Sequence, residues 1–131
     1  MADNPTSSFA GHKYLSLESF RKNGQGVATP VWFAEEGGVL YVLSEADAGK
    51  VKRIRNNPRV RVAPCNFRGA LKGGWLEATA RLLAPDEAAH AEALLIAKYW
   101  FAKRVGNFFA KFSNHQRTYI AVQPPGAAAR G

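Results

Sequence analysis

The chain has 131 residues, 47% of them apolar and 21% charged, which fits one globular domain and excludes an intrinsically disordered protein. Eighteen Lys and Arg against ten Asp and Glu give a formal net charge of +8 and an isoelectric point near 10.0. This balance favours anionic partners, whether phosphorylated coenzymes, nucleic acid or an anionic membrane surface, without choosing among them.

The single cysteine and the N-terminal residues indicate the cellular compartment in which we expect the protein. Cys65 is the only cysteine, which excludes an intrachain disulfide and a multi-cysteine metal site and suggests a reducing compartment. The first residues lack a signal-peptide pattern, and no apolar run is long enough to cross a bilayer. We therefore expect a cytoplasmic protein without stable membrane insertion, with tails at residues 1–10 and 124–131 around a domain of residues 11–123.

Polarity patterns predict three strands in the first third of the chain. Residues 13–20 alternate in polarity, and residues 39–44 are rich in β-forming side chains. A strand at residues 27–34 lies between them, interrupted or bent at Pro30. Residues 22–26 contain Asn-Gly, which supplies the positive φ angles of a hairpin turn.

The pattern then changes from strand to helix and back. Residues 47–57 place Val51 and Ile54 on one helical face and basic side chains around the others. A longer helix is predicted after Asp86, which we expect to be its cap. The remaining predicted strands are residues 59–64, 75–83 and 118–123. Strands joined mostly by hairpins, with short lateral helices, favour a mainly β antiparallel barrel over a parallel α/β sheet.

Known catalytic and metal-binding patterns are missing from the sequence. His12, His90 and His115 are scattered, none at metal-ligand spacing from another ligand, so we predict no metal site. No nucleophile elbow, Walker loop or dinucleotide-binding glycine pattern occurs. Cys65 closes a predicted strand, where a small buried side chain is its expected role. If the protein is an enzyme, we expect the reactive atoms to belong to a cofactor.

Residues 44–55 are the densest group of functional candidates, because a strand leads there through small residues into a basic helix. A helix N-terminus stabilises phosphate through its free N–H groups and partial positive charge. Lys50 and Arg53 lie three residues apart, on one face, where they could hold the same anion. Two other interpretations stay open: a solvated basic helix face, and a nucleic-acid interface that continues through Arg59 and Arg61.

A second unusual feature is the aromatic content of residues 98–101 and 108–112, which a surface helix does not require. Aromatic side chains at helical spacing usually pack in a core or a dimer interface. The alternative is a hydrophobic wall over a planar substrate. Trp75 has the same two interpretations, and Gly106 is expected to break or bend the helix.

Two segments together resemble a known family. Residues 29–33 (Thr-Pro-Val-Trp-Phe) and residues 49–65 are similar to the pyridoxamine-phosphate-oxidase-like split-barrel superfamily, and more narrowly to its F420-dependent branch. The resemblance covers roughly residues 13–123, and the second segment is its specific part. It implies an antiparallel six-stranded split β-barrel of the FMN-binding type, in a homodimer with two coenzyme sites between the subunits.

The resemblance also implies positions for the coenzyme. The helix-opening Lys50, with Arg53, would hold its phosphate; residues 28–31 would pass beside its ring system, and residues 63–64 would lie near the ring or ribityl chain. The candidate coenzyme-binding residues are Ala28, Thr29, Pro30, Val31, Ser44, Lys50, Arg53, Ala63, Pro64 and Cys65. Catalytic residues remain unassigned.

One departure from the family pattern bears on the choice of coenzyme. Many FMN-binding members carry an arginine in the second strand, and residues 27–31 here read Val-Ala-Thr-Pro-Val. This absence favours deazaflavin F420 over FMN. F420 carries a phosphodiester and a polyglutamate tail, which a basic groove would attract; the candidate cations for the tail are Lys52, Arg55, Arg68 and Lys72.

The leading functional hypothesis is an F420-dependent oxidoreductase that transfers a hydride between the coenzyme and a small planar or unsaturated organic substrate. An FMN-dependent pyridoxamine-phosphate-oxidase-like enzyme is the first alternative. A non-catalytic protein that binds a coenzyme, haem or fatty acid is the second, and a nucleic-acid binder is the third. We expect a homodimer that binds small molecules and no nucleic acid.

Overall fold

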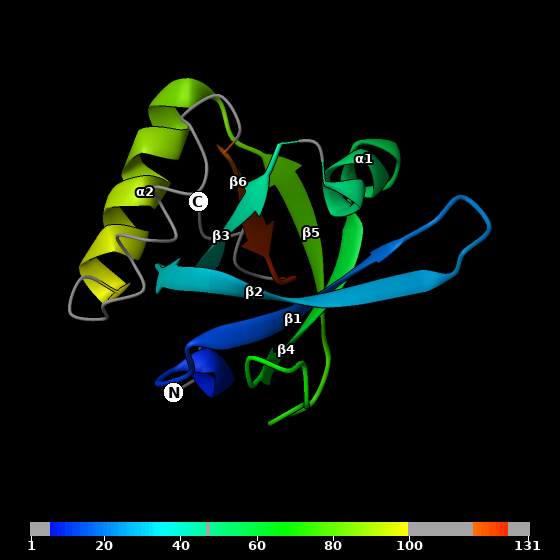
Figure 1. The fold of residues 1–131 in the computed structure, drawn as a ribbon, viewed down its shortest axis with the longest axis horizontal. Coiled ribbons are helices and arrows are strands. Elements are labelled where there is room, and N and C mark those ends of the chain that lie inside the picture. The colour runs from blue at the N-terminus through cyan, green and yellow to red at the C-terminus, as the bar shows by residue number, and fades with distance from the viewer. Residues whose placement is uncertain (1–5, 47, 100–116, 126–131) are drawn as a thin grey trace.

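The computed structural model describes residues 6–46, 48–99 and 117–125, which form a closed six-stranded barrel with two α-helices (Figure 1). The strands follow the order β1-β2-β3-β6-β5-β4, and every neighbouring pair is antiparallel. They are β1 (Tyr14–Phe20), β2 (Gly26–Glu36), β3 (Val39–Glu45), β4 (Arg59–Cys65), β5 (Leu76–Leu82) and β6 (Arg117–Gln123). The helices are η1 (Ser7–Phe9), α1 (Gly49–Asn56) and α2 (Pro85–Tyr99). The predicted fold class is confirmed.

The barrel interior is built from alternate residues of each strand, because successive side chains of a strand point to opposite faces. Leu15 and Leu17 of β1 lie there beside Val31 and Phe33 of β2. α1 adds Val51 and Ile54 to this cluster, so the helix is fixed against the barrel by its apolar face. α2 packs on the outside, where its apolar residues form a second cluster with residues of β2, β3 and β6: Trp32, Ala34, Leu43, Ala91, Leu95, Tyr99 and Tyr119.

β2 continues through Pro30 without a break, so of the two expected effects of this proline, an interruption or a bend, the interruption is wrong. The reason lies in its pairing. Residues Gly26 to Trp32 of β2 pair with β1, whereas the ladder with β3 begins only at Phe33↔Val42. A proline is tolerated in a strand that has a partner on one side only, because its missing N–H can point to the open side.

The same pairing leaves one edge of β2 open. The β2–β3 ladder ends at Phe33↔Val42, so the first half of β2 and the last residues of β3 are not hydrogen-bonded to each other. α1 follows β3 closely in the chain, on the open side of this split. Backbone groups that point away from β1 in this half of β2 therefore have no strand partner.

Several predicted boundaries shift by one or two residues, and two differences have clear causes. α1 begins at Gly49 rather than at residue 47, after Ala48 with extended backbone angles. Asp86 lies in the first turn of α2 instead of capping it: Pro85 opens the helix, and the carboxylate of Glu87 accepts the N–H of Ala84 at 3.3 Å. This is the acidic half of a capping box.

The N-terminal segment departs from the expected tail. Phe9 is only 1% exposed and belongs to the barrel core, where its ring meets Phe33 edge to face. Residues 6–10 therefore pack on the domain instead of extending from it. Within the described ranges, no helix has the length and apolarity that crossing a membrane requires. The aromatic residues 100–101 and 108–112, the expected bend at Gly106, and His115 lie outside the described residues.

Candidate functional site: a cation cluster beside an open strand edge

α1 directs most of its basic side chains away from the barrel. Val51 and Ile54 occupy the core, so the remaining positions of this eight-residue helix face outward or sideways. They include the four cations Lys50, Lys52, Arg53 and Arg55. The helix packs against β1 and β5, and its middle and last turns lie beside the hairpin that joins β1 to β2 (Figure 1).

Lys50 is half-buried at the start of this helix. Burial lowers the pKa of its amine, and the nearby charge of Arg53 lowers it further, while Glu45 acts in the opposite direction. The charged amine is thus disfavoured here, and a bound anion would restore the balance by stabilising the protonated form. Lys50 and Arg53 are thus close enough for their charges to interact.

Arg53 is anchored to the barrel wall. Its Nε–H donates to the Oγ of Ser19 at 2.7 Å. Burial lowers the pKa of its guanidinium, as does the charge of Arg21, so a further cation lies near Arg53. Arg21 follows β1 at the start of the hairpin, whose turn is closed by a bond of 2.8 Å from Gly24 N to Arg21 O.

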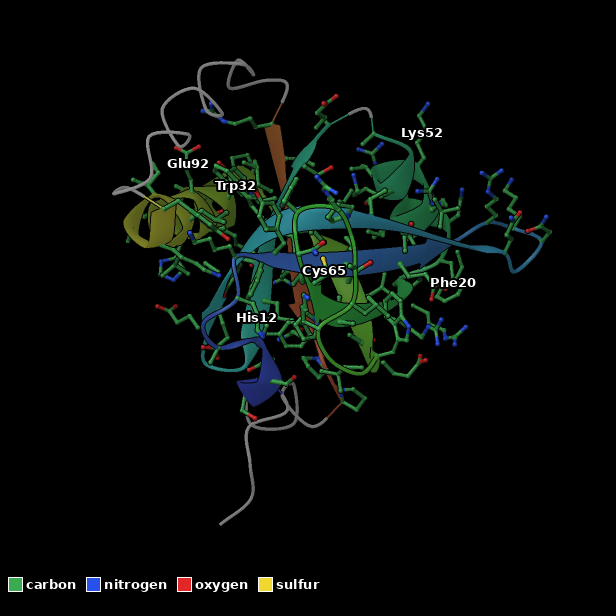
Figure 2. The ribbon with its side chains drawn as sticks, turned by 60° about the horizontal axis from the view of Figure 1, so that its bottom comes forward. His12, Phe20, Trp32, Lys52, Cys65 and Glu92 are labelled. Carbon is green, nitrogen blue, oxygen red and sulfur yellow. The ribbon has the colours of Figure 1, made fainter. Side chains whose placement is uncertain are left out.

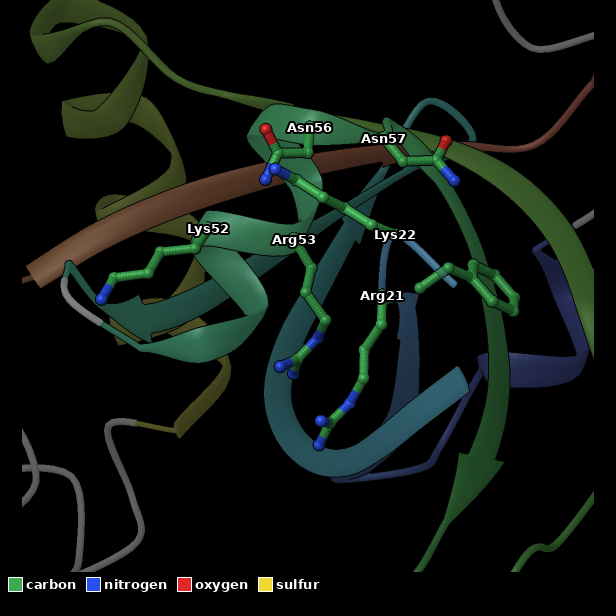
Figure 3. A pocket seen from close by; sticks show the side chains of 7 residues that line it. Arg21, Lys22, Lys52, Arg53, Asn56 and Asn57 are labelled. Carbon is green, nitrogen blue, oxygen red and sulfur yellow. The ribbon is translucent and has the colours of Figure 1, made fainter. Parts of the chain in front are cut away.

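Figure 3 shows Arg21 and Arg53 side by side, with their guanidinium groups pointing the same way. They line a basic pocket of about 510 Å³ between the hairpin and α1. The lining residues are Phe20, Arg21, Lys22, Lys52, Arg53, Asn56 and Asn57. Four of the seven are cations and none is a carboxylate. Arg21 and Lys22 were not among the predicted site residues, although their position next to the Asn-Gly turn was a signal for their exposure.

The ion pairs of the described residues lie elsewhere. They join Arg59 to Glu77, Arg61 to Glu18, Arg81 to Glu87, His90 to Glu36 and Arg117 to Glu92. The cations of the pocket and Lys50 take part in none of these pairs. Because like charges gathered without a counter-ion repel one another, this cluster creates a local field that attracts anions.

The strand residues of the predicted site divide between the two faces of the sheet. In the register of β2, Thr29 and Val31 pair with Leu17 and Leu15, so they face the barrel interior. Ala28 and Pro30 alternate with them and face outward. Likewise Ser44 and Pro64 continue the inward rows of their strands, whereas Ala63 and Cys65 belong to the outward rows. One ligand cannot touch all of these side chains.

The loop between β4 and β5 covers part of the outward face. A Cβ on Gly69 would lie 3.9 Å from Cδ of Pro30, so the loop crosses β1 to reach β2 (Figure 2). Cys65 is buried at the start of this loop, and burial raises the pKa of its thiol. The length of β4 separates Cys65, Arg68 and Lys72 from α1, roughly 20 Å for a seven-residue strand. Arg68 and Lys72 therefore lie far from Lys52.

One inward-facing residue near the split between β2 and β3 has a buried polar atom without a hydrogen-bond partner among the described residues. The hydroxyl oxygen of Thr29 is buried and has no hydrogen-bond partner among the described residues. Thr29 lies on the half of β2 that lacks β3 as a neighbour. Ser44 lies two residues beyond the last residue of β3 that pairs with β2, and its hydroxyl donates to the carbonyl oxygen of Glu45 at 3.1 Å. An unsatisfied buried hydroxyl at this place is a candidate ligand contact.

Among the side chains that the structure describes, no three His, Cys, Asp or Glu lie close enough to share a metal ion. His90 is exposed, and its Nε2 lies 2.6 Å from a carboxylate oxygen of Glu36. The site offers Lys50 and the four cations of the pocket, together with the buried hydroxyl of Thr29 beside the open edge of β2. These groups fit a phosphate-bearing ligand.

Comparison with known proteins relates the chain to one family. The family model for pyridoxamine 5'-phosphate oxidase matches residues 6–127. No curated protein matches the sequence. Among solved structures, a protein from Listeria innocua assigned provisionally as a pyridoxamine 5'-phosphate oxidase is similar, with 19% identity and a TM-score of 0.65 over 91% of this chain and 89% of that one.

Two other similar structures are described as haem proteins. A haem-binding protein from Mycobacterium smegmatis is 16% identical, with a TM-score of 0.66 over 92% of this chain and 50% of that one. The haem storage protein HutZ from Vibrio cholerae is 14% identical, with a TM-score of 0.64 over 87% and 82%. At these identities the likeness concerns the fold.

Proposed function

The chain belongs to the pyridoxamine 5'-phosphate oxidase family, and from this premise we propose that it binds deazaflavin coenzyme F420 between α1 and the open edge of β2. In that site it would act as an oxidoreductase on a small planar or unsaturated substrate. The observation that carries the proposal is the cluster of Lys50, Arg53 and Arg21, which takes part in none of the ion pairs of the described residues and lies beside the split between β2 and β3.

The cluster is assigned to the phosphodiester. Lys50 supplies a half-buried point charge at the first turn of α1, and Arg53 supplies a planar guanidinium held by Ser19. Phosphate oxygens accept charge-assisted hydrogen bonds from both groups, and each such bond contributes more than a neutral one. Binding also removes the repulsion between the three cations.

The ring system is assigned to residues 28–31 of β2. Their backbone groups on the side away from β1 have no strand partner, and the hydroxyl of Thr29 is free to bond a ring or side-chain oxygen. When bound, the coenzyme accepts or donates a hydride directly at its ring. The protein then needs only to orient the ring and exclude water, which is consistent with a site that lacks a nucleophile or catalytic dyad.

F420 is preferred to FMN on two grounds. Residues 27–31 contain no arginine for a second phosphate contact, as the sequence indicated. The pocket beyond Arg53 adds Arg21, Lys22 and Lys52, and a chain of glutamates extending from the phosphate would meet these cations. Exposed contacts of this kind contribute about 1 kcal/mol or less each.

The proposal includes a small-molecule substrate and a homodimer in which each site is completed by the second subunit. The family relationship supports both. The substrate would lie on the face of the ring opposite β2, where the chain must also exclude water.

The test compares F420, FMN and haem as ligands of the wild-type protein and of Lys22→Gln, by fluorescence and absorbance titration. We expect F420 to bind most tightly, and Lys22→Gln to weaken F420 more than FMN, because only F420 has a tail that reaches Lys22. If Lys22→Gln weakens F420 and FMN equally, the glutamate tail does not bind in this pocket. Tighter binding of FMN or haem than of F420 would replace the proposed coenzyme.

A further inference from the structure

Arg53 is held more firmly than an arginine on a helix surface needs to be. Its Nε–H donates to the hydroxyl of Ser19, which is 0% exposed and lies on the inward face of β1. Nη1 and Nη2 remain, and neither has a hydrogen-bond partner within the described residues. Two neighbouring nitrogens of a planar guanidinium match two oxygens of one phosphate group.

Gly49 supplies the space that this orientation needs. A Cβ on Gly49 would lie 2.8 Å from Nη1 of Arg53, closer than real side chains approach. The backbone does not explain this glycine, because its φ is not among the positive values that favour glycine. Alanine would suit a helix better. The missing side chain leaves room for the guanidinium as the bond to Ser19 orients it, over the first residue of α1.

We infer that Ser19 and Gly49 are positioning residues that fix the guanidinium of Arg53 for the coenzyme phosphate without touching the coenzyme themselves. Ser19 holds Nε from the barrel side, and Gly49 leaves room for Nη1 above the helix start. The inference rests on the proposed function, because it assigns both residues to the phosphate site.

The physical reason is the repulsion within the cluster. The charge of Arg21 lowers the pKa of Arg53, and the charge of Arg53 lowers the pKa of Lys50. A free arginine in this position would turn toward solvent, and a ligand would then have to order it at an entropic cost. The bond to Ser19 sets the side chain in its binding orientation before the ligand arrives. Loss of that bond, or a methyl group at Gly49, should therefore lower the affinity for phosphate-bearing ligands.

The experiment measures F420 and FMN affinity for wild type, Ser19→Ala, Gly49→Ala and Arg53→Gln, with a melting temperature for each. We expect Ser19→Ala and Gly49→Ala to weaken F420 about tenfold each, the size of one lost charge-assisted hydrogen bond. Gly49→Ala should melt at or above the wild-type temperature, which separates positioning from folding. In the Arg53→Gln background, both substitutions should have no further effect on affinity.

The outcomes distinguish this inference from the proposed function. Wild-type affinity for F420 in both positioning variants, or in Arg53→Gln, overturns the inference and leaves coenzyme binding in place. If the wild type binds neither F420 nor FMN, the proposed function fails, and calorimetry with inorganic phosphate then decides. Phosphate binding that is about tenfold weaker in Ser19→Ala and in Gly49→Ala than in the wild type supports the positioning role. Phosphate binding of equal strength in all three proteins, or no phosphate binding at all, overturns the positioning role.

Discussion

At the scale of single residues, the cations around Arg53 are the most informative feature. Lys50, Arg53 and Arg21 come from a helix and a hairpin that are distant in sequence, and each lacks an acidic partner among the described ion pairs. Proteins usually pair or disperse such charges. A cluster that is unfavourable in the free protein is expected to have a use when an anion is bound.

The first prediction concerns Lys50. Lys50→Ala should weaken F420 binding by roughly 1–3 kcal/mol, the range for a lost charge-assisted hydrogen bond. Lys72→Ala is the matched control, because Lys72 lies on the loop at the other end of β4. Fluorescence titration that gives both variants the wild-type affinity would place Lys50 outside the site.

The second prediction concerns pH. Burial and Arg53 lower the pKa of Lys50, and a phosphodiester binds the protonated amine. Affinity for F420 should therefore fall as pH rises, and at a lower pH than an ordinary lysine would cause. Lys50→Arg should remove most of this decline, because arginine stays charged. Identical pH profiles of the wild type and Lys50→Arg would show that another group causes the decline.

At the scale of elements, one tyrosine joins α2 to the barrel. The hydroxyl of Tyr99 lies 2.6 Å from the carbonyl oxygen of Lys13 and 2.9 Å from that of Phe33, and it accepts the N–H of Phe33 at 3.3 Å. Its ring stacks on Trp32 at 4.5 Å. Burial raises the pKa of this hydroxyl, so it stays protonated and keeps donating at physiological pH.

The third prediction follows from these bonds. Tyr99→Phe keeps the stacked ring but removes the hydrogen bonds of the hydroxyl to the backbone of Lys13 and Phe33, so the free energy of unfolding should fall by about 1–3 kcal/mol. Tyr41→Phe is the control, because no hydrogen bond is described for the Tyr41 hydroxyl; its effect should stay within about 0.5 kcal/mol. Urea denaturation measures both. Similar effects of the two substitutions would contradict the anchoring role.

The elements themselves were largely predictable from sequence. The Arg-Val alternation of β4, the Asn-Gly turn and the change to helical periodicity after β3 are local signals, and all three appear in the structure. The unbroken course of β2 through Pro30 was not predictable, because it depends on which strand neighbours that residue. Pairing partners are a property of the whole sheet.

The site was predictable only in part for the same reason. Lys50 and Arg53 share a helix, so their spacing sufficed to place them together. Arg21 joins them through the packing of α1 on β1, which no local pattern reveals. The sequence did contain a signal for Ser19, which occupies an apolar position in the alternation of residues 13–20. A polar side chain that faces the barrel interior is expected to have a buried hydrogen-bond partner, and here the partner is Arg53.

At the scale of the whole molecule, the fourth prediction is a homodimer. Phe67 and Leu71 are 58% and 45% exposed on the loop between β4 and β5, and a second copy could bury this apolar surface. Light scattering should give a mass near twice 14.3 kDa. A monomer at micromolar concentration would contradict both the dimer and a site completed by a second subunit.

The most direct test of the central claim is a titration of the wild-type protein with F420 at low and moderate salt, repeated in the presence of an oligonucleotide. We expect one saturable site per chain, a weaker dependence on salt than nucleic-acid binding shows, and little competition from the oligonucleotide, because Val51 and Ile54 tie the basic segment into the core and the segment presents no stacking aromatic ring. Tight, strongly salt-dependent oligonucleotide binding without measurable F420 binding would contradict the proposed function.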